Sequence, residues 1–218
     1  MEHDFWAERY SNNQIGFHLP GPNPHLVAHA ATWLKAPSRV LVPLCGKSHD
    51  LHWLREQGHD VVGVEFVEAA AIAFFEEHGL EPAVSRIGPH PSLRAPGISI
   101  ILDDFFALTP ASAGRFPAIY DRAALIAIEP AKRPAYLKRL RELGTDDVSL
   151  LLVGFDHDLG TGPPFSLSAA ELGALMVGQW AFWQLADVDV LATEPRFRAR
   201  GATRVREQIW LAQPLPGR

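Results

Sequence analysis

One stretch of sequence decides the fold: SRVLVPLCGKSHDLHWLREQGHDVVGVEF, residues 38–66. Residues 39–43 form a short aliphatic run, which predicts a buried strand. The loop that follows contains Gly46, and glycine lets a ligand approach the backbone closely. Helix signals continue from the loop to Gly58, with Ser48 or Asp50 as the candidate cap, and residues 60–66 then form a second apolar run. The stretch therefore predicts a strand, a tight loop, a helix and a second buried strand.

An acid stands at the end of the second predicted strand. Glu65 lies nineteen positions after Gly46, and an acid about that far beyond a glycine loop can accept hydrogen bonds from two ribose hydroxyls. The loop has one glycine instead of G-x-G-x-x-G, so it offers no nest of amides for a pyrophosphate. Gly46-Lys47-Ser48 is similar to the end of a P-loop, but the leading glycine of that motif would fall at Leu41, inside the strand.

The cofactor predicted from this segment is S-adenosylmethionine. It carries a ribose and an adenine but no phosphate, and its sulfonium is a cation that aromatic faces attract. One glycine, one acid and nearby aromatic side chains therefore suffice to bind it. The alternative that the residues leave open is an ordinary parallel βαβ unit with an exposed acid.

Composition excludes several other classes of protein. The 218 residues predict one domain with a substantial core, and the net charge of −5 argues against a nucleic-acid binder. The acidic start, residues 1–4, is followed by no long apolar run, so neither a signal peptide nor a membrane span is predicted. The single cysteine, Cys45, excludes an internal disulfide and favours a cytoplasmic location. We assign no chemistry to this thiol.

The ten histidines do not predict a metal site. His25 and His29 have the helical spacing of two zinc ligands, yet neither H-E-x-x-H nor a cysteine cluster accompanies them. His49 and His52 flank the exposed start of a predicted helix. We therefore expect no bound metal ion.

Strands and helices continue to alternate along the chain. Ser168 and Glu171 predict a capping box at the start of one helix. Further helices are expected from Pro24 to Pro37, over residues 68–78 and from Pro130, and further strands over residues 97–102, 117–121 and 148–153.

The end of the chain departs from this alternation of strands and helices. Residues 183–191 and 203–212 are strand-like runs, and the loop that joins them contains no crossover helix. Such strands are expected to be antiparallel. The predicted fold is thus a doubly wound, Rossmann-like α/β domain over residues 1–218, whose mostly parallel sheet ends in an antiparallel pair. Residues 1–37 form an N-terminal helical cover and residues 38–218 the core.

Ligands of such a sheet bind beyond the carboxyl ends of the strands. The residues expected there are Leu44, Glu65, Asp104 and Arg122. A loop over residues 160–164, rich in glycine and proline, follows the fifth predicted strand and is expected to form part of a lid.

Five motifs of the chain belong together. They are Phe5-Trp6-x-x-x-Tyr10, Ile15-Gly16-Phe17-His18, Pro43-Leu44-Cys45-Gly46-Lys47-Ser48, Gly58-His59-x-Val61-Val62-Gly63-Val64-Glu65 and Tyr120-Asp121-Arg122-Ala123-Ala124-Leu125. Taken together, they resemble the thiopurine S-methyltransferase family, particularly its bacterial members, and the resemblance runs from about Phe5 to Leu211. The resemblance implies a class I S-adenosylmethionine-dependent methyltransferase that methylates the sulfur of small aromatic thiols and releases S-adenosylhomocysteine. Bacterial relatives are also associated with the methylation of selenium and tellurium compounds.

The resemblance also assigns roles to individual residues. It implies that the cofactor is contacted by Trp6, Tyr10, Leu44, Glu65, Asp104, Phe105 and Arg122. Phe17 and Arg196 would lie on the substrate side. The chain departs from the family at Tyr10, where a second tryptophan is usual, and at Asp104, where some members carry serine. Asp104 would add an acceptor for the adenine amino group.

Each of these roles has a structural alternative. Trp6 and Tyr10 lie one helical turn apart and would also fit a hydrophobic stripe. Arg122 would also fit an ion pair with Asp121 or Asp104, and Arg196 belongs to an arginine-rich stretch that solvent alone could explain.

Methyl transfer depends mainly on positioning the acceptor and excluding water. We expect Arg122 and Arg196 to act as the catalytic residues by favouring the anionic thiolate. The alternatives are methylation of a small oxygen or nitrogen nucleophile, which would need a base, and a non-catalytic domain that binds adenosylmethionine. The expected partner is a small thiol or chalcogen compound, without nucleic acid or membrane, and the expected state is a monomer.

Overall fold

A nine-stranded sheet runs through the part of the chain that the structure, a computed structural model, describes, residues 3–215. Residues 1–2 and 216–218 of the predicted domain lie outside this part. The strand order is β3-β4-β5-β2-β1-β6-β7-β9-β8. The central strands are parallel: β5 (Ile98–Ile101), β2 (Asp60–Val64), β1 (Arg39–Pro43), β6 (Phe116–Arg122) and β7 (Gly144–His157). This arrangement confirms the predicted Rossmann-like α/β fold.

Strand β1 lies at the centre because it is apolar on both faces. Its Val40, Leu41 and Val42 are buried, and Val40 pairs with Val61 of β2 on one side and with Ala118 of β6 on the other. A strand covered on both faces needs such a continuous apolar run. Because the chain leads from β1 to β2 on one side and reaches β6 on the other, a ligand crevice is expected beyond the carboxyl ends of these strands.

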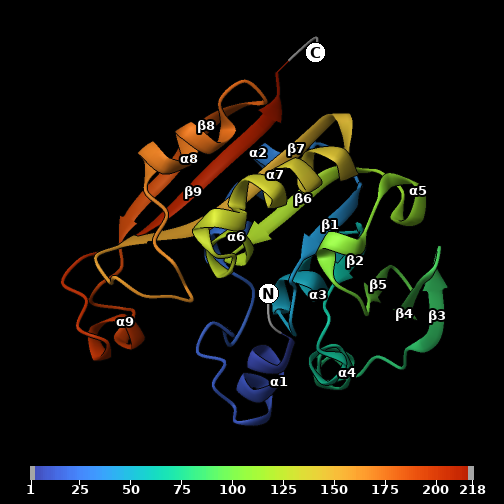
Figure 1. Cartoon of the computed structure of the whole chain (residues 1–218). Helices are drawn as coiled ribbons and strands as arrows, with labels where there is room; N and C mark the ends of the chain where they lie inside the picture. The colour runs from blue at the N-terminus through green and yellow to red at the C-terminus, as the bar shows by residue number, and fades with distance from the viewer. Residues whose placement is uncertain (1–2, 216–218) are drawn as a thin grey trace.

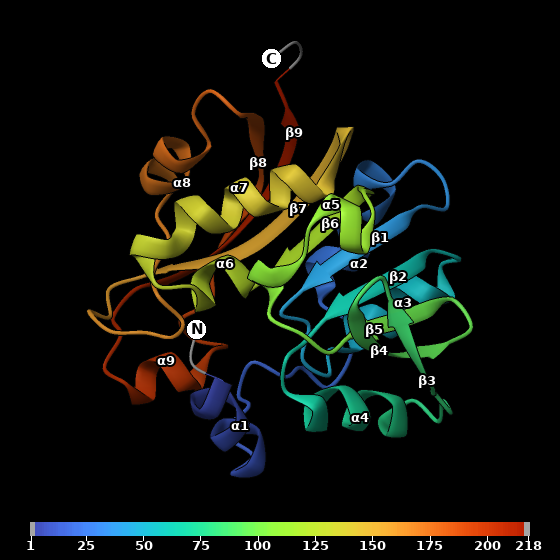
Figure 2. The same cartoon turned by 45° about the vertical axis from the view of Figure 1, so that its right-hand side comes forward.

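Helices cover both faces of the sheet (Figures 1 and 2). One apolar cluster includes residues of α2 (Pro24–Trp33), α3 (His49–Glu56) and α4 (Glu68–Glu77). The cluster on the other face includes residues of α5 (Pro110–Ala113), α6 (Ala124–Ala127), α7 (Arg133–Leu143) and α8 (Ala169–Met176). Helix α1 (His3–Ser11) covers neither face; both figures show it below the ends of the central strands.

Polar side chains begin two of the predicted helices. The Ser48 hydroxyl accepts a hydrogen bond from the amide of Asp50 at α3, and the Ser168 hydroxyl accepts one from the amide of Glu171 at α8. Each bond satisfies an amide that the first helical turn leaves free. The predicted capping box at α8 is only half formed, because the Glu171 carboxylate accepts a hydrogen bond from Arg133 instead.

The end of the sheet is antiparallel, as predicted. Strand β9 (Val205–Pro214) pairs antiparallel with β7 on one side and with β8 (Trp180–Asp189) on the other. The connection between β8 and β9 contains a short helix, α9 (Pro195–Ala199), which the sequence did not predict. This helix does not cross the sheet, so the two strands remain antiparallel neighbours.

The sequence also failed to predict a hairpin. Strands β3 (Ala83–Ile87) and β4 (His90–Ala95) form the other edge of the sheet, and β4 pairs antiparallel with β5. Residues of β3 are exposed or half-buried throughout, so the strand lacks the alternation of apolar and polar residues that marks a half-buried strand.

Among residues 3–215, no helix combines the length and apolar character needed to cross a membrane.

Candidate active site

A cavity of about 270 Å³ lies beyond the carboxyl ends of β1, β2 and β6. All the predicted site residues line it: Trp6, Tyr10, Phe17, Leu44, Glu65, Asp104, Phe105, Arg122 and Arg196. We call the strand-end residues Leu44, Glu65 and Arg122 the floor of the cavity. We call residues 3–18, which comprise α1 and the segment after it, the cover.

The glycine loop of the floor turns sharply between β1 and α3. Leu44 has a φ of 49° and Gly46 a φ of 53°, both in the left-handed region that only glycine adopts without a steric penalty. The amide of Cys45 donates to the carbonyl oxygen of Val64, which holds the loop against the end of β2. A leucine kept in this conformation beside a cavity is a strained residue at a ligand-facing position.

Glu65 is buried at the centre of the floor, with 5% of its surface exposed. Its Oε2 accepts a hydrogen bond of 2.9 Å from the amide of Gly46, and its Oε1 accepts one of 2.8 Å from the amide of Val67. Burial raises the pKa of this carboxyl to about 7, although the amide donors oppose the shift. Each carboxylate oxygen has a second lone pair, so Glu65 can both tie the glycine loop to α4 and accept ribose hydroxyls.

The cover places three aromatic rings over the floor. The ring of Phe17 makes edge contacts with Trp6 and Tyr10, at centroid distances of 5.8 and 6.1 Å. Tyr10 lies directly on the glycine loop, because a Cβ added to Gly46 would be 2.1 Å from the Tyr10 Oη. The loop therefore needs glycine at residue 46 for its conformation and also for the approach of Tyr10.

Arg122 connects the floor to the cover. Its Nε forms an ion pair of 2.8 Å with Oδ2 of Asp50, its Nη1 donates to the carbonyl oxygen of Phe17 at 3.1 Å, and its Nη2 donates to Ser48 Oγ at 3.3 Å. The structure therefore differs from the alternative in which Asp121 or Asp104 is the partner.

Asp121 has a different role, in the core. It accepts hydrogen bonds from the amides of Ala124 and Leu125 and from the hydroxyl of Tyr136. Burial raises the pKa of this carboxyl to about 6, against the effect of these donors. Asp121 thus fixes the turn between β6 and α6 instead of facing Arg122.

Arg196 holds the cover from the opposite side. Its Nη1 donates to the carbonyl oxygen of Gly16 at 2.8 Å, and its Nε pairs with Oε2 of Glu194 at the same distance. Its guanidinium carbon lies 5.4 Å from the ring centre of Phe155 and 5.2 Å from that of Phe197. Arg196 is therefore not a freely solvated side chain, and the two arginines bind the carbonyl groups of adjacent cover residues.

The predicted adenine-side residues differ in exposure. Asp104 is exposed, and its Oδ1 accepts from the amide of Phe106, which begins a short 3₁₀ helix. Phe105 is 3% exposed and packs on Tyr136 at a centroid distance of 4.9 Å. Phe106 is half-buried and also lines the cavity, so it offers more of its ring to a ligand than Phe105 does.

The sequence missed several residues of the site. Asp50 is 1% exposed and binds Arg122, the amide of Asn23 and the hydroxyl of Tyr120, but the sequence indicated only a helix cap. Other lining residues that were not predicted are Arg9, Phe155, Phe197 and Arg200. Pro163 and Pro164 also line the cavity, and they belong to the loop over residues 160–164 that was predicted to form part of a lid.

The chain is similar to known proteins over almost its whole length. The family model described as Thiopurine S-methyltransferase (TPMT) matches residues 1–214. The chain is 43% identical over 218 residues to the thiopurine S-methyltransferase of Xanthomonas campestris pv. campestris, covering 98% of this chain and 99% of that protein. It is 42% identical over 216 residues to the protein of the same name from Pseudomonas paraeruginosa, covering 98% and 99%.

Solved structures with the same fold include methyltransferases. A Burkholderia thailandensis 1,6-didemethyltoxoflavin-N1-methyltransferase with bound S-adenosylhomocysteine aligns with a TM-score of 0.65 at 18% identity, covering 97% of this chain and 85% of that chain. The N-terminal domain of EvdMO1, solved in the presence of SAH and D-fucose, aligns with a TM-score of 0.61 at 15% identity, covering 99% and 98%.

Proposed function

The chain belongs to the thiopurine S-methyltransferase family and is an S-adenosylmethionine-dependent methyltransferase, and we propose that its acceptor is the sulfur of small aromatic or heterocyclic thiols. The observation that carries this proposal is the division of the cavity into two parts. One part has the buried Glu65 beneath the glycine loop. The other has aromatic rings around Arg196.

The floor fits the cofactor that the family uses. Glu65 would accept the ribose hydroxyls, Leu44 would contact the cofactor from the glycine loop, and Asp104 would accept from the adenine amino group. Trp6 and Tyr10 would cover the sulfonium side, where aromatic faces attract a cation. When bound, S-adenosylmethionine supplies an electrophilic methyl group.

The substrate part fits a flat apolar ring. Phe17, Phe155 and Phe197 line it together with the guanidinium group of Arg196. A positive charge close to a thiol lowers the pKa of that thiol by favouring the thiolate, and the aromatic cover excludes water from the attacking sulfur. We propose that Arg122 acts from the cofactor side and Arg196 from the substrate side, without removing the proton themselves.

A polarizable thiolate needs little help from a general base, and within residues 3–215 those that line the cavity offer no free base. Among the described residues that line the cavity there is no histidine. The carboxylate of Asp50 is paired with Arg122, and Glu65 accepts two backbone amides. The other two carboxylates of the lining also have partners: Oδ2 of Asp103 lies 2.7 Å from the Nδ1 of His90, and Oδ1 of Asp104 accepts from the amide of Phe106. These observations favour sulfur over an oxygen or nitrogen acceptor, whose proton a base would have to remove.

A methyl-transfer assay with isosteric acceptors tests the proposal. Thiophenol, phenol and aniline present the same ring with sulfur, oxygen or nitrogen, and selenite and tellurite test the acceptors associated with bacterial relatives. We expect turnover of adenosylmethionine with thiophenol and none with phenol or aniline. Faster turnover of phenol or aniline, or binding of adenosylmethionine without turnover of any acceptor, would contradict the proposal.

A further inference from the structure

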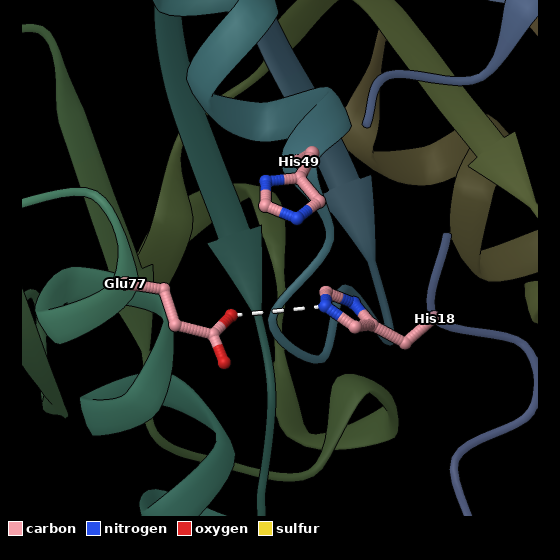
Figure 3. Close-up of side chains that lie close together, drawn as sticks. All are labelled: His18, His49 and Glu77. Carbon is pink, nitrogen blue, oxygen red and sulfur yellow. Dashed lines mark ion pairs between the residues drawn. The ribbon is translucent and has the colours of Figure 1, made fainter. Parts of the chain in front are cut away.

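Three side chains of metal-binding type meet outside the cavity, beside the glycine loop. His18 ends the cover, His49 begins α3 and Glu77 ends α4, and each offers a ligand atom within 4.8 Å of the other two. In Figure 3 the His18 ring and the Glu77 carboxylate face each other below the ring of His49. Residues 3–215 contain no second group of three such side chains at this spacing.

A chain of hydrogen bonds orients the ring of His49. The Nδ1 of His78 lies 2.7 Å from the carbonyl oxygen of Phe74, which can only accept, so this nitrogen donates. In a neutral ring the Nε2 of His78 is then an acceptor, and it lies 2.9 Å from the Nδ1 of His49. His49 therefore donates through Nδ1 and keeps a lone pair on Nε2. Figure 3 shows a nitrogen of His49 pointing toward the space between His18 and Glu77.

This arrangement is that of a metal ligand with an outer-shell partner. Histidines that bind metal ions usually donate their second ring N–H to a fixed acceptor, which sets the tautomer and the ring orientation. Here His78 is that acceptor for His49.

Glu77 also has one oxygen available. Its Oε1 binds the ammonium of Lys47, while its Oε2 faces the Nε2 of His18 at 3.7 Å, which is too long for a hydrogen bond. Lys47 therefore occupies one side of the carboxylate and leaves the other side directed at the histidines. Its positive charge would lower the affinity for a cation, so we expect moderate rather than tight binding.

We propose that His18, His49 and Glu77 bind a divalent transition-metal ion of the Zn²⁺ type, which ties the end of the cover to the core. Two imidazoles and one carboxylate form a donor set that suits Zn²⁺ and leaves a fourth position for water. Ligands of tetrahedral Zn²⁺ lie roughly 3.4 Å apart, so the side chains must converge by about 1.5 Å at most. Rotations of the half-buried His18 and the exposed Glu77 can supply this movement.

Bound metal would restrain the cover from outside the cavity. Phe17 precedes His18 directly, and its carbonyl oxygen accepts from Arg122. A metal bond at His18 would therefore add a further restraint next to Phe17, whose ring contacts Tyr10 on the glycine loop. Glu77 and His49 belong to helices packed on the sheet, so the restraint connects a movable segment to a fixed one.

Calorimetric titration of the metal-free full-length protein with ZnCl₂ tests the site. We expect saturable binding of one Zn²⁺ ion. Loss of an outer-shell partner of a metal ligand costs about 10–100-fold in affinity, so His78→Ala should weaken binding within this range. Loss of a ligand itself should cost more than loss of its outer-shell partner, so His18→Ala and His49→Ala should weaken binding further than His78→Ala does. Glu77→Gln should also weaken binding.

The matched control is His29→Ala. His29 stacks on His25 with 6.4 Å between the ring centres, and this pair also lies near a carboxylate, because the Nε2 of His25 is 3.1 Å from Oε2 of Glu207. Affinity should be unchanged in this control. Loss of binding in His29→Ala, with wild-type affinity in His18→Ala and His49→Ala, would overturn the proposal.

Hydrogen exchange gives a second readout that does not depend on activity. Saturating Zn²⁺ should slow amide exchange over residues 12–23 in the wild type and not in His49→Ala. Absence of Zn²⁺ binding by the wild type, or equal protection in both proteins, would contradict the proposed site. Melting of each variant without metal checks that the fold is retained.

Discussion

The floor and the cover form opposite walls of one cavity, but different interactions hold them. In the floor, Glu65 is buried, accepts two backbone amides and follows a strand at the centre of the sheet. In the cover, none of the residues of α1, His3–Ser11, is buried. Aromatic edge contacts and the guanidinium groups of Arg122 and Arg196 hold the cover instead.

This difference indicates which wall moves. Opening the floor would break strand pairing and buried hydrogen bonds, whereas opening the cover breaks side-chain contacts and the packing of Ile15 but no strand pairing. Enzymes that exclude water from a reaction commonly close a segment over a preformed site. We therefore infer that the floor binds the cofactor in a fixed geometry and that the cover closes afterwards.

The largest expected effect is a loss of folding stability when Arg122, which contacts both the floor and the cover, is replaced. Arg122→Ala leaves the buried carboxylate of Asp50 without its ion-pair partner, and loss of one partner of a buried pair costs about 3–5 kcal/mol. Asp50 keeps its hydrogen bonds with Asn23 and Tyr120, so we expect a cost at the lower end of this range. Arg196→Ala should cost less than about 1 kcal/mol, because its pair with Glu194 is partly exposed.

Chemical denaturation measures both free energies of unfolding. Arg122→Lys keeps the charge and should lie between the wild type and Arg122→Ala, because lysine cannot reproduce the planar fork of hydrogen bonds. Equal losses in Arg122→Ala and Arg196→Ala would mean that Arg122 belongs to the cover alone.

The next largest effect is a loss of cofactor affinity when Glu65 of the floor is replaced. Glu65→Ala should weaken S-adenosylhomocysteine binding by roughly tenfold to several hundredfold, since two charge-assisted hydrogen bonds at about 1.5–3 kcal/mol each are lost and water replaces part of them. Calorimetry measures the affinity. Glu68→Ala, an exposed acid at the start of α4, is the control and should bind as the wild type does. An affinity within about threefold of the wild type in Glu65→Ala would remove Glu65 from the cofactor site.

The pH dependence of binding tests the same carboxyl with a smaller effect. Burial raises the pKa of Glu65 from its ordinary value, 4.5, to about 7. Between these values the folded protein holds the proton more tightly, so Glu65 lowers the stability of the fold as pH rises through this range. Cofactor affinity should change with pH in the opposite direction to folding stability, because ribose hydroxyls donate hydrogen bonds to the ionised carboxylate.

Affinity for S-adenosylhomocysteine should therefore rise about tenfold between pH 6 and pH 8. Titration at several pH values measures this rise, and Glu65→Gln should remove it, since glutamine does not titrate. A flat profile in the wild type would show that the ionised form of Glu65 is not required.

The contact between Tyr10 and Gly46 couples the two walls more weakly. In Gly46→Ala the new Cβ would lie 2.1 Å from the Tyr10 Oη but 3.4 Å from its Cζ. Tyr10→Phe should therefore rescue part of the loss in cofactor affinity caused by Gly46→Ala, with a coupling of about 1 kcal/mol in a double-mutant cycle. Additive effects would mean that Tyr10 leaves the loop when the cofactor binds. The strain of alanine at a φ of 53° remains in both backgrounds.

The same contrast explains what the sequence could predict. The parallel strands and the strand-end residues follow from local runs of apolar residues that end in Leu44 or Glu65. The pairing of Arg122 with Asp50 joins residues far apart in the chain, and no local pattern indicates it. The cluster of His18, His49 and Glu77 was missed for the same reason. Strand β3 was missed because its residues have no buried face.

Hydrogen exchange of the metal-free protein, with and without saturating S-adenosylhomocysteine, tests most directly whether the cover closes over a preformed floor. We predict slower exchange in the cover, residues 3–18, on adding the ligand. Exchange in strands β1 and β2 should be slow in both states and serves as the internal reference. Unchanged exchange in the cover at saturation, or new protection confined to the strands, would contradict the account.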